Sequence, residues 1–239
     1  EEALSKHDHS AVKRLLKDKK KKHTQQKYFN GQSALHVACD YGDVTMAKIF
    51  LKNKANPNDC DDLKQTPLHI ACKQGNLNLI LLLLRKGANP AVSSFQGNTP
   101  LHFLAGHKAE PNASNFIAVL DKLKEEGAEL NPRNSHGETP LHCAALKKSE
   151  KIAMWLIRQG ADVSISNKKG ETALHYAAKN GSKALVSLLI SVGACPDKEG
   201  DAGSARCYAI NAKRQEIVEL FDQVATKSAN PVNNERLLS

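Results

Sequence analysis

The chain has 239 residues, of which 41% are hydrophobic and 25% charged, and its formal net charge is +9. This balance predicts a folded protein rather than a disordered one, and no apolar run approaches the length of about 20 residues that a membrane-spanning helix needs. Aromatic residues make up only 5%, so we expect a core of Leu, Ile, Val and Ala.

Much of the positive charge lies in the first 27 residues. They hold nine Lys and Arg against four Asp and Glu, and they include the run Lys19-Lys20-Lys21-Lys22. Such a run is typical of a nuclear-import signal, an anionic-lipid contact or a nucleic-acid contact, and equally of a solvated link between folded segments. No aromatic residues lie between these lysines to stack on bases, so a nucleic-acid role is not favoured.

A four-residue phrase then recurs along the chain. Its starting residues lie 33, 33, 40, 33 and 32 positions apart, and a second phrase, Gly-Ala-Asn at Gly87 and variants of it elsewhere, follows each full copy. Two phrases in phase over five copies indicate a repeat architecture. The copies of the first phrase are Ser33-Ala34-Leu35-His36, Thr66-Pro67-Leu68-His69, Thr99-Pro100-Leu101-His102, Thr139-Pro140-Leu141-His142, Thr172-Ala173-Leu174-His175 and a degenerate one at Ser204.

The sequence of each unit predicts two helices and a turn. Thr99 suits the N-cap of the first helix and Pro100 its first position. A second helix, as at 77–85, ends near Gly87, because a left-handed residue after a helix costs least for Gly. One such pair cannot bury its apolar face alone, so neighbouring units must stack.

These phrases resemble ankyrin repeats, whose Thr-Pro-Leu-His-x-Ala phrase is almost intact at Thr66–Ala71. The resemblance covers roughly residues 1–226 and implies an all-α ankyrin-repeat solenoid. Antiparallel helix pairs would form an L-shaped stack with short β-hairpin fingers, in about six to seven repeats including caps. We expect one domain at 1–226, with a partial repeat at 1–27, full repeats near 28–60, 61–93, 94–133, 134–166 and 167–199, a cap at 200–226, and a flexible tail at 227–239.

Several positions depart from the repeated pattern. Arg206 stands where the phrase has its buried Leu, and Cys207 stands where it has His. A charged residue there cannot face another repeat, which predicts that the last unit is a cap. The 40-residue spacing places seven extra residues within 108–114, and Lys64 and Lys148 occupy turn positions where the pattern has Gly.

The sequence does not favour metal binding, disulfide bonds or catalysis. Histidines of the phrase recur once per repeat, about 10 Å apart, too far to bind one metal. The resemblance implies that they join neighbouring repeats by hydrogen bonds. Six cysteines without a Cys-x-x-Cys pair suggest reduced thiols, with Cys39, Cys72 and Trp155 in the core. No phosphate loop, Gly-x-Gly-x-x-Gly or Gly-x-Ser-x-Gly motif occurs, so we expect no catalysis, cofactor or metal.

The resemblance implies a binding face made of the finger tips and the exposed side of each first helix. Phe29, Tyr41, Leu63 and Phe95 are candidate hot spots, although Phe29 and Phe95 could instead pack against a neighbouring finger. The expected partner-binding residues are Phe29, Asn30, Gln32, Asp40, Tyr41, Asp62, Leu63, Gln65, Lys73, Gln74, Phe95, Gln96, Asn98, His107, His136, Glu138, Lys147, Lys168, Lys169, Glu171 and Lys179.

Charge changes along this face. Aspartates gather around the first two full repeats, and lysines gather around the fourth and fifth. A partner with the complementary gradient would be oriented by it. The aspartates are Asp40, Asp43, Asp59, Asp61 and Asp62, and the lysines are Lys147, Lys148, Lys168, Lys169 and Lys179.

The leading interpretation is a monomeric, non-catalytic protein–protein interaction module, an adaptor or scaffold in the cytoplasm or nucleus, whose protein or peptide partner is unidentified. Two alternatives stay open. The chain starts without Met and within a repeat, which suits a regulatory or targeting segment of a larger enzyme or channel, such as a kinase or a small-GTPase-activating protein. An inhibitor of an NF-κB-like transcription factor is the other. Weak anionic-lipid contact through the N-terminal lysines also stays open.

Overall fold

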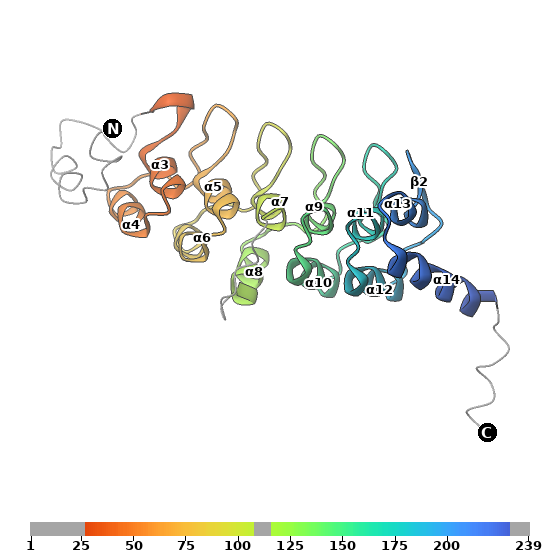
Figure 1. Ribbon diagram of the computed structural model, residues 1–239. Coiled ribbons are helices and arrows are strands. Elements are labelled where there is room, and N and C mark those ends of the chain that lie inside the picture. The colour runs from red at the N-terminus through yellow and green to blue at the C-terminus, as the bar shows by residue number, and fades with distance from the viewer. Residues whose placement is uncertain (1–26, 108–115, 230–239) are drawn as a thin grey trace, which may run out of the picture. The chain divides into compact units, whose positions relative to one another are not determined.

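In the computed structural model, residues 27–107 and 116–229 are described (Figure 1). Two compact units divide the chain, Glu1–Ser135 and His136–Ser239. This division falls within the stretch 1–226 that the sequence predicts as one domain, and the repeat boundaries stay a prediction. Residues 1–26 of the predicted partial repeat, which include the lysine run, and the insertion at 108–114 lie outside the described residues.

Unit 1 is a row of helix pairs joined by loops that project from one side (Figure 1). The first helices of successive pairs pack on one another, α3 on α5 and α5 on α7, and the second helices do the same, α4 on α6 and α6 on α8. The elements are the 3-10 turn η2 (Phe29–Gly31), α3 (Ala34–Asp40), α4 (Val44–Lys52), α5 (Pro67–Gln74), α6 (Leu77–Leu84), α7 (Pro100–Ala105) and α8 (Phe116–Glu125).

Unit 2 repeats this arrangement. Its first helices pack α9 on α11 and α11 on α13, and its second helices pack α10 on α12 and α12 on α14. The elements are α9 (Pro140–Lys147), α10 (Glu150–Arg158), α11 (Ala173–Asn180), α12 (Lys183–Ser191), β1 (Glu199–Gly200), β2 (Gly203–Ser204), α13 (Ala205–Asn211) and α14 (Gln215–Ala229).

The projecting loops, or fingers, differ in form from the expected β-hairpins. Among the described residues, strands form only in the last finger, where β1 pairs antiparallel with β2, and an isolated bridge joins Lys27 to Ser33. The other fingers close with turns, as where the Asp61 N–H donates to the Gln65 carbonyl over 3.0 Å. The other fingers of the described residues therefore have no strand ladder, and turn hydrogen bonds fix their backbones instead.

The phrase itself explains where each first helix begins. At the start of α5, the N–H of Thr66 donates to Nδ1 of His69 over 3.0 Å, and the Thr66 hydroxyl lies 2.9 Å from the same nitrogen. Thr66 is extended and Pro67 follows it as the first helical residue. The same bond from the N-cap N–H to the imidazole recurs at Ser33, Thr99, Thr139 and Thr172.

Lys64 and Lys148, the two lysines at glycine positions of the turns, are left-handed, as are Lys54 and Lys213 among the described residues. Lys64 has φ +56° at its finger tip, and Lys148 has φ +60° after α9. The residues that take the place of Lys148 after α5 and α11 are Gly75 and Gly181, both with positive φ. Left-handed conformations cost a residue with a Cβ more than they cost Gly, so both lysines are strained relative to their counterparts.

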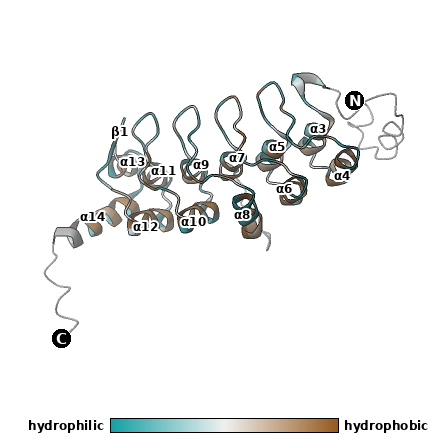
Figure 2. Ribbon diagram, turned by 180° about the vertical axis from the view of Figure 1, so that it is seen from behind, coloured by the Kyte–Doolittle hydropathy of each residue, from teal (hydrophilic) through white to brown (hydrophobic). Residues whose placement is uncertain are grey.

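Apolar side chains are concentrated on the helices and polar ones on the fingers in both units (Figure 2). Leu68 and Leu79 in unit 1, and Leu156 and Leu189 in unit 2, are fully buried. Cys39, Cys72 and Trp155 are buried as well, which confirms their expected place in the core. Small and branched side chains thus fill the space between successive helix pairs.

The last repeat has the features expected of a cap. Arg206 is exposed and its guanidinium contacts the Asp222 carboxylate, so the predicted solvent-facing position is confirmed. Ile217 and Phe221 on α14 are buried. Helix α14 continues through Ala229, so its last turn lies in the segment predicted as a tail, and that boundary was wrong. No helix in the described ranges is long and apolar enough to cross a bilayer.

Candidate functional site

Backbone hydrogen bonds fix the finger tips of unit 1 relative to one another. The Asp62 N–H donates to the Asn30 carbonyl over 3.0 Å, and the Phe95 N–H donates to the Leu63 carbonyl over 2.8 Å. The Ser135 N–H continues the series to the Gln96 carbonyl. In unit 2 the Lys168 N–H donates to the His136 carbonyl, and the Asp201 N–H to the Lys169 carbonyl. Within each unit, these hydrogen bonds therefore join the finger tips into one continuous surface.

Side chains also brace individual fingers. Oδ1 of Asp61 accepts the N–H groups of Leu63 and Gln65 at 2.9 and 2.7 Å. Asn167 does the same in unit 2, where its Oδ1 accepts the N–H groups of Lys169 and Glu171. Each brace needs an oxygen at the end of an Asp or Asn side chain, five residues before the next N-cap.

Three apolar side chains of the predicted face are exposed in unit 1. Phe95 is 75% exposed, Leu63 is 56% and Tyr41 is 50%. Phe95 therefore does not pack into a neighbouring finger, which was the alternative for it. The side chain of Phe29 lies outside what is described. Large apolar side chains that stay exposed on such a face are typical of surfaces that contact a partner.

Most other predicted site residues are accessible, and Glu171 is the exception. The structure buries Glu171, which is only 8% exposed, so its side chain is not available to a partner. Half-buried are Gln32, Gln65, Asn98, His107 and Glu138. Exposed are Asn30, Asp40, Asp62, Lys73, Gln74, Gln96, His136, Lys147, Lys168, Lys169 and Lys179.

The Glu171 carboxylate is the centre of a hydrogen-bonded cluster in unit 2. It accepts from the Tyr208 hydroxyl at 2.6 Å, the Asn167 amide at 2.8 Å and the Tyr176 hydroxyl at 2.9 Å. Burial by itself would raise the pKa of Glu171, but these three hydrogen bonds outweigh it and the net pKa is lowered. Burial, with the neighbouring carboxylate, raises the pKa of Tyr208 to about 12 and that of Tyr176 further.

Three of the five phrase histidines are seen to join neighbouring repeats, as the resemblance implies. Nε2 of His36, His69 and His142 lies 2.9 to 3.1 Å from a carbonyl of the next finger. Burial lowers the pKa of His69 to about 4 despite the hydrogen bond with that carbonyl, so the neutral ring donates from Nε2. For His175 the contact is looser: its buried Nε2 has no well-formed hydrogen bond among the described residues, although the carbonyls of Lys198 and Gly203 partly offset the lowering of its pKa by burial. The spacing there is 32, and Gly203 is paired within the β1–β2 hairpin.

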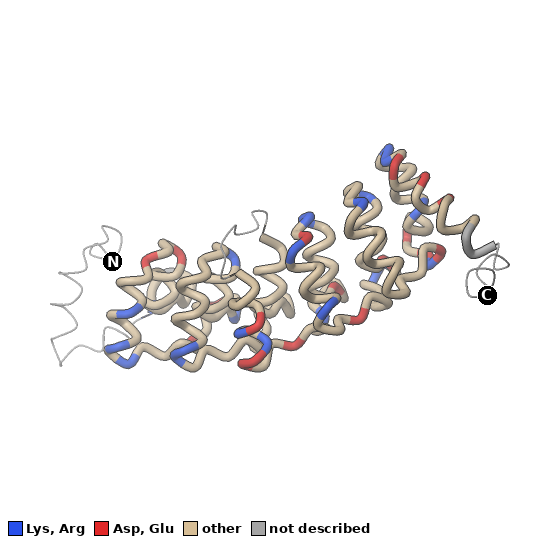
Figure 3. The backbone as a smooth tube through the Cα atoms, turned by 90° about the horizontal axis from the view of Figure 1, so that it is seen from below, with Lys and Arg blue, Asp and Glu red and all other residues tan. Residues whose placement is uncertain are grey.

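The acidic part of the predicted charge gradient is weaker than the sequence suggests. Asp61 is buried under its finger, and the Asp43 carboxylate caps α4 by accepting the Met46 N–H at 2.8 Å. Asp40 and Asp62 remain exposed. In unit 2 the predicted lysines are all exposed, and Figure 3 shows basic residues along the turns of that unit. We therefore expect the charge of unit 2 to affect binding more than that of unit 1.

A sequence model of ankyrin repeats, in three copies, matches residues 2–94, 89–167 and 148–230. These matches extend over nearly the whole chain. The chain belongs to the ankyrin repeat family. A comparison with curated proteins finds no match.

Ankyrin repeats are generally protein–protein interaction modules and are typically non-catalytic. Burial raises the pKa of the Cys39 and Cys72 thiols of this ankyrin chain, which keeps them protonated. Within the described ranges, no three His, Cys, Asp or Glu side chains gather as metal ligands would.

Two features of this ankyrin chain escaped the sequence analysis. One is the Glu171 cluster, for which the signal was Tyr at the same position of two successive repeats, Tyr176 and Tyr208. The other is a hollow over Phe103, which takes the place of those tyrosines in its own repeat.

The finger before α7 lacks this brace, and this leads to a stability prediction. Ser94 stands where Asp61 and Asn167 stand, and its buried Oγ has no partner among the described residues. Ser94→Asp places an acceptor within reach of the N–H groups of Gln96 and Asn98, and should stabilise the chain by about 1 kcal/mol. Hydrogen exchange at those two amides should slow.

Ser93→Asp is the matched control, because Ser93 is exposed and one position outside the bracing register. It should leave both amides and the unfolding midpoint unchanged. Equal effects of the two variants, or none from Ser94→Asp, would show that this position does not brace the finger.

Proposed function

We propose that this chain is a non-catalytic adaptor or scaffold that binds a protein or peptide partner through its finger tips and first helices. The observation that carries the proposal is the pair Leu63 and Phe95. Their backbones are joined by a hydrogen bond across adjacent tips, and both side chains are largely exposed. Nothing in the packing of the repeats requires apolar groups there, so a partner is the physical reason for them.

The proposed surface of unit 1 also includes Tyr41, Asp40 and Asp62, and that of unit 2 is basic. Apolar anchors surrounded by charge are the usual composition of a hot spot with its rim. Six free cysteines, with Cys39 and Cys72 in the core, suit a reducing compartment, so we propose a cytoplasmic or nuclear location.

Purification of partners with the tagged full chain, followed by affinity measurements, tests this proposal. Leu63→Ala and Phe95→Ala should each weaken the partner's binding by about thirtyfold, since truncating a hot-spot residue costs about 2 kcal/mol or more. Ile117→Ala is the control, because Ile117 is 46% exposed but lies on α8, a second helix. It should change the Kd less than twofold.

The reverse pattern would contradict the proposed surface. If Ile117→Ala weakens binding while both finger variants bind normally, the partner uses the second helices. If the tagged full chain enriches no partner over the tag alone, the interaction function itself is wrong.

A further inference from the structure

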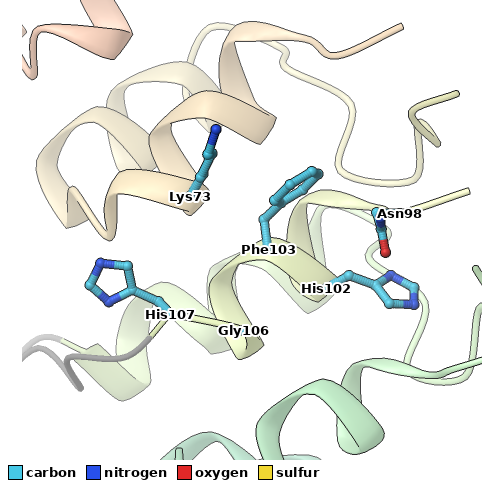
Figure 4. Close-up of a pocket in the computed structure, with 6 residues that line it drawn as sticks. All are labelled: Lys73, Asn98, His102, Phe103, Gly106 and His107. Carbon is cyan, nitrogen blue, oxygen red and sulfur yellow. The ribbon is translucent and has the colours of Figure 1, made fainter. Parts of the chain in front are cut away.

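A hollow of about 390 Å³ lies between the end of α5 and helix α7 in unit 1 (Figure 4). It is lined by Lys73, Asn98, His102, Phe103, Gly106 and His107. Lys73 comes from one repeat and the other five from the next. Three of the six belong to the predicted binding face, so the hollow opens on the side where a partner is expected.

The Phe103 ring provides an apolar floor. Phe103 is half-buried, and its ring meets the ring of His69 edge-on, with 5.7 Å between centroids and 86° between planes. In Figure 4 the Phe103 and Lys73 side chains rise from their helices toward the same space. The ring is thus held by its neighbour while part of it stays accessible.

Gly106 keeps this space open. It has φ −81° and ψ 1°, which any residue adopts, and a Cβ there would meet only carbonyls of its own helix, at 3.2 and 3.7 Å. The same position of other repeats carries side chains, namely Asp40, Lys73, Leu146 and Lys179. The backbone does not require Gly here, and its effect is to leave the ring uncovered.

The rim of the hollow donates hydrogen bonds. Lys73 contributes an exposed ammonium, and Asn98 contributes its amide NH₂, since its Oδ1 already accepts from Asn134. His107 is packed so closely on Gly75 that a Cβ at Gly75 would lie 2.9 Å from the ring. None of the six lining residues has a carboxylate. An apolar floor beneath cationic and amide donors fits a short apolar stem that ends in an anion.

We propose that the hollow binds a glutamate side chain of the partner, with its two methylenes on Phe103 and its carboxylate against Lys73 and Asn98. The inference rests on the proposed interaction function and specifies its ligand. Aspartate has one methylene fewer to lay on the ring, so glutamate is the better match. A phosphorylated residue fits less well, because the hollow offers no arginine for a phosphate.

The test is a displayed library of random dodecapeptides selected against the full chain. Glutamate should be enriched at one fixed position of the selected peptides. A synthetic peptide with that consensus should lose about tenfold in affinity when its Glu is replaced by Gln. A phosphoserine version that binds more tightly than the Glu peptide would show that the ligand is a phosphate and overturn the assignment.

Chain variants then locate the site. Lys73→Met should weaken the Glu peptide about fivefold and leave the Gln peptide unchanged, which is the pattern of a direct pair. Gly106→Leu should weaken both peptides more than tenfold by filling the hollow. It should fold, because Leu146 occupies the same position in another repeat, and thermal melting checks this. Lys179→Met, the equivalent lysine of unit 2, is the control and should change neither affinity.

Two negative outcomes separate this inference from the function it rests on. Peptides that bind tightly without a fixed Glu, or that bind the Gly106→Leu variant normally, overturn the glutamate site and leave the interaction function standing. If the full chain selects no peptide above background, the proposed function fails, and the inference fails with it.

Discussion

A chain that ends at Lys198 will lose on the order of 5 kcal/mol of stability in unit 2, because the last repeat covers the apolar face of α11 and α12. The structure packs α13 on α11 and α14 on α12. Tyr208, Ile217 and Phe221 of this repeat are buried. Removing them loses their own burial and exposes the apolar surfaces that they cover on the remaining helices. Trp155 is the single tryptophan of the chain, so urea unfolding followed by its fluorescence reports on unit 2.

A chain ending at Ala229 is the matched control, since it keeps every described residue, and its midpoint should equal that of the full chain. If the shortest chain does not fold at all, Phe221→Ala keeps the prediction testable. It should cost about 3 kcal/mol, the usual effect of truncating a buried Phe. Glu219→Ala, on the exposed side of the same helix, should cost little. Equal stability of the Lys198 and Ala229 chains would show that α13 and α14 do not cap the unit.

The sequence predicts this cap because one residue breaks the pattern. Each full copy of the phrase has a Leu that is buried between helices, and Arg206 in its place cannot be buried unpaired. The helices were predictable for the same reason, since Thr, Pro and His recur in a fixed order that starts a helix. The end of α14 was not predictable, because the sequence after Ser204 has no further copy of the phrase against which to set its length.

The candidate site was predictable in its positions but not in its burial. Glu171 occupies the position of Gln65 and Asn98, which are half-buried, so the repeat pattern alone suggests an accessible side chain. Its burial follows from Tyr176 and Tyr208, whose hydroxyls converge on it from two helices. Such convergence depends on the packing of α11 against α13, which spacing in the sequence does not give.

Replacing Glu171 by Ala will destabilise unit 2 by about 3 kcal/mol, because the change removes the charged acceptor that three buried donors share and leaves Tyr176 only its longer contact with Glu138, at 3.2 Å. The donors are the hydroxyls of Tyr176 and Tyr208 and the amide of Asn167. Since Tyr208 lies on α13, the cluster also ties the cap to the finger before α11. Glu171→Gln keeps an acceptor but turns an NH₂ toward the donors, and should cost about half as much. Urea unfolding monitored at Trp155 measures both.

The charge of Glu171 gives these variants distinct pH profiles. Its hydrogen bonds lower its pKa in the folded chain below the ordinary value of 4.5, so folding favours the ionised form. The stabilisation is fully present above pH 4.5 and is lost as the pH falls through the lowered pKa. The stability difference between the wild-type chain and Glu171→Gln should therefore be constant near neutrality and shrink below pH 4.5. Glu216→Ala, an exposed carboxylate of the same unit, should run parallel to the wild type. A difference that stays constant down to low pH would mean that Glu171 contributes through packing and not through its charge.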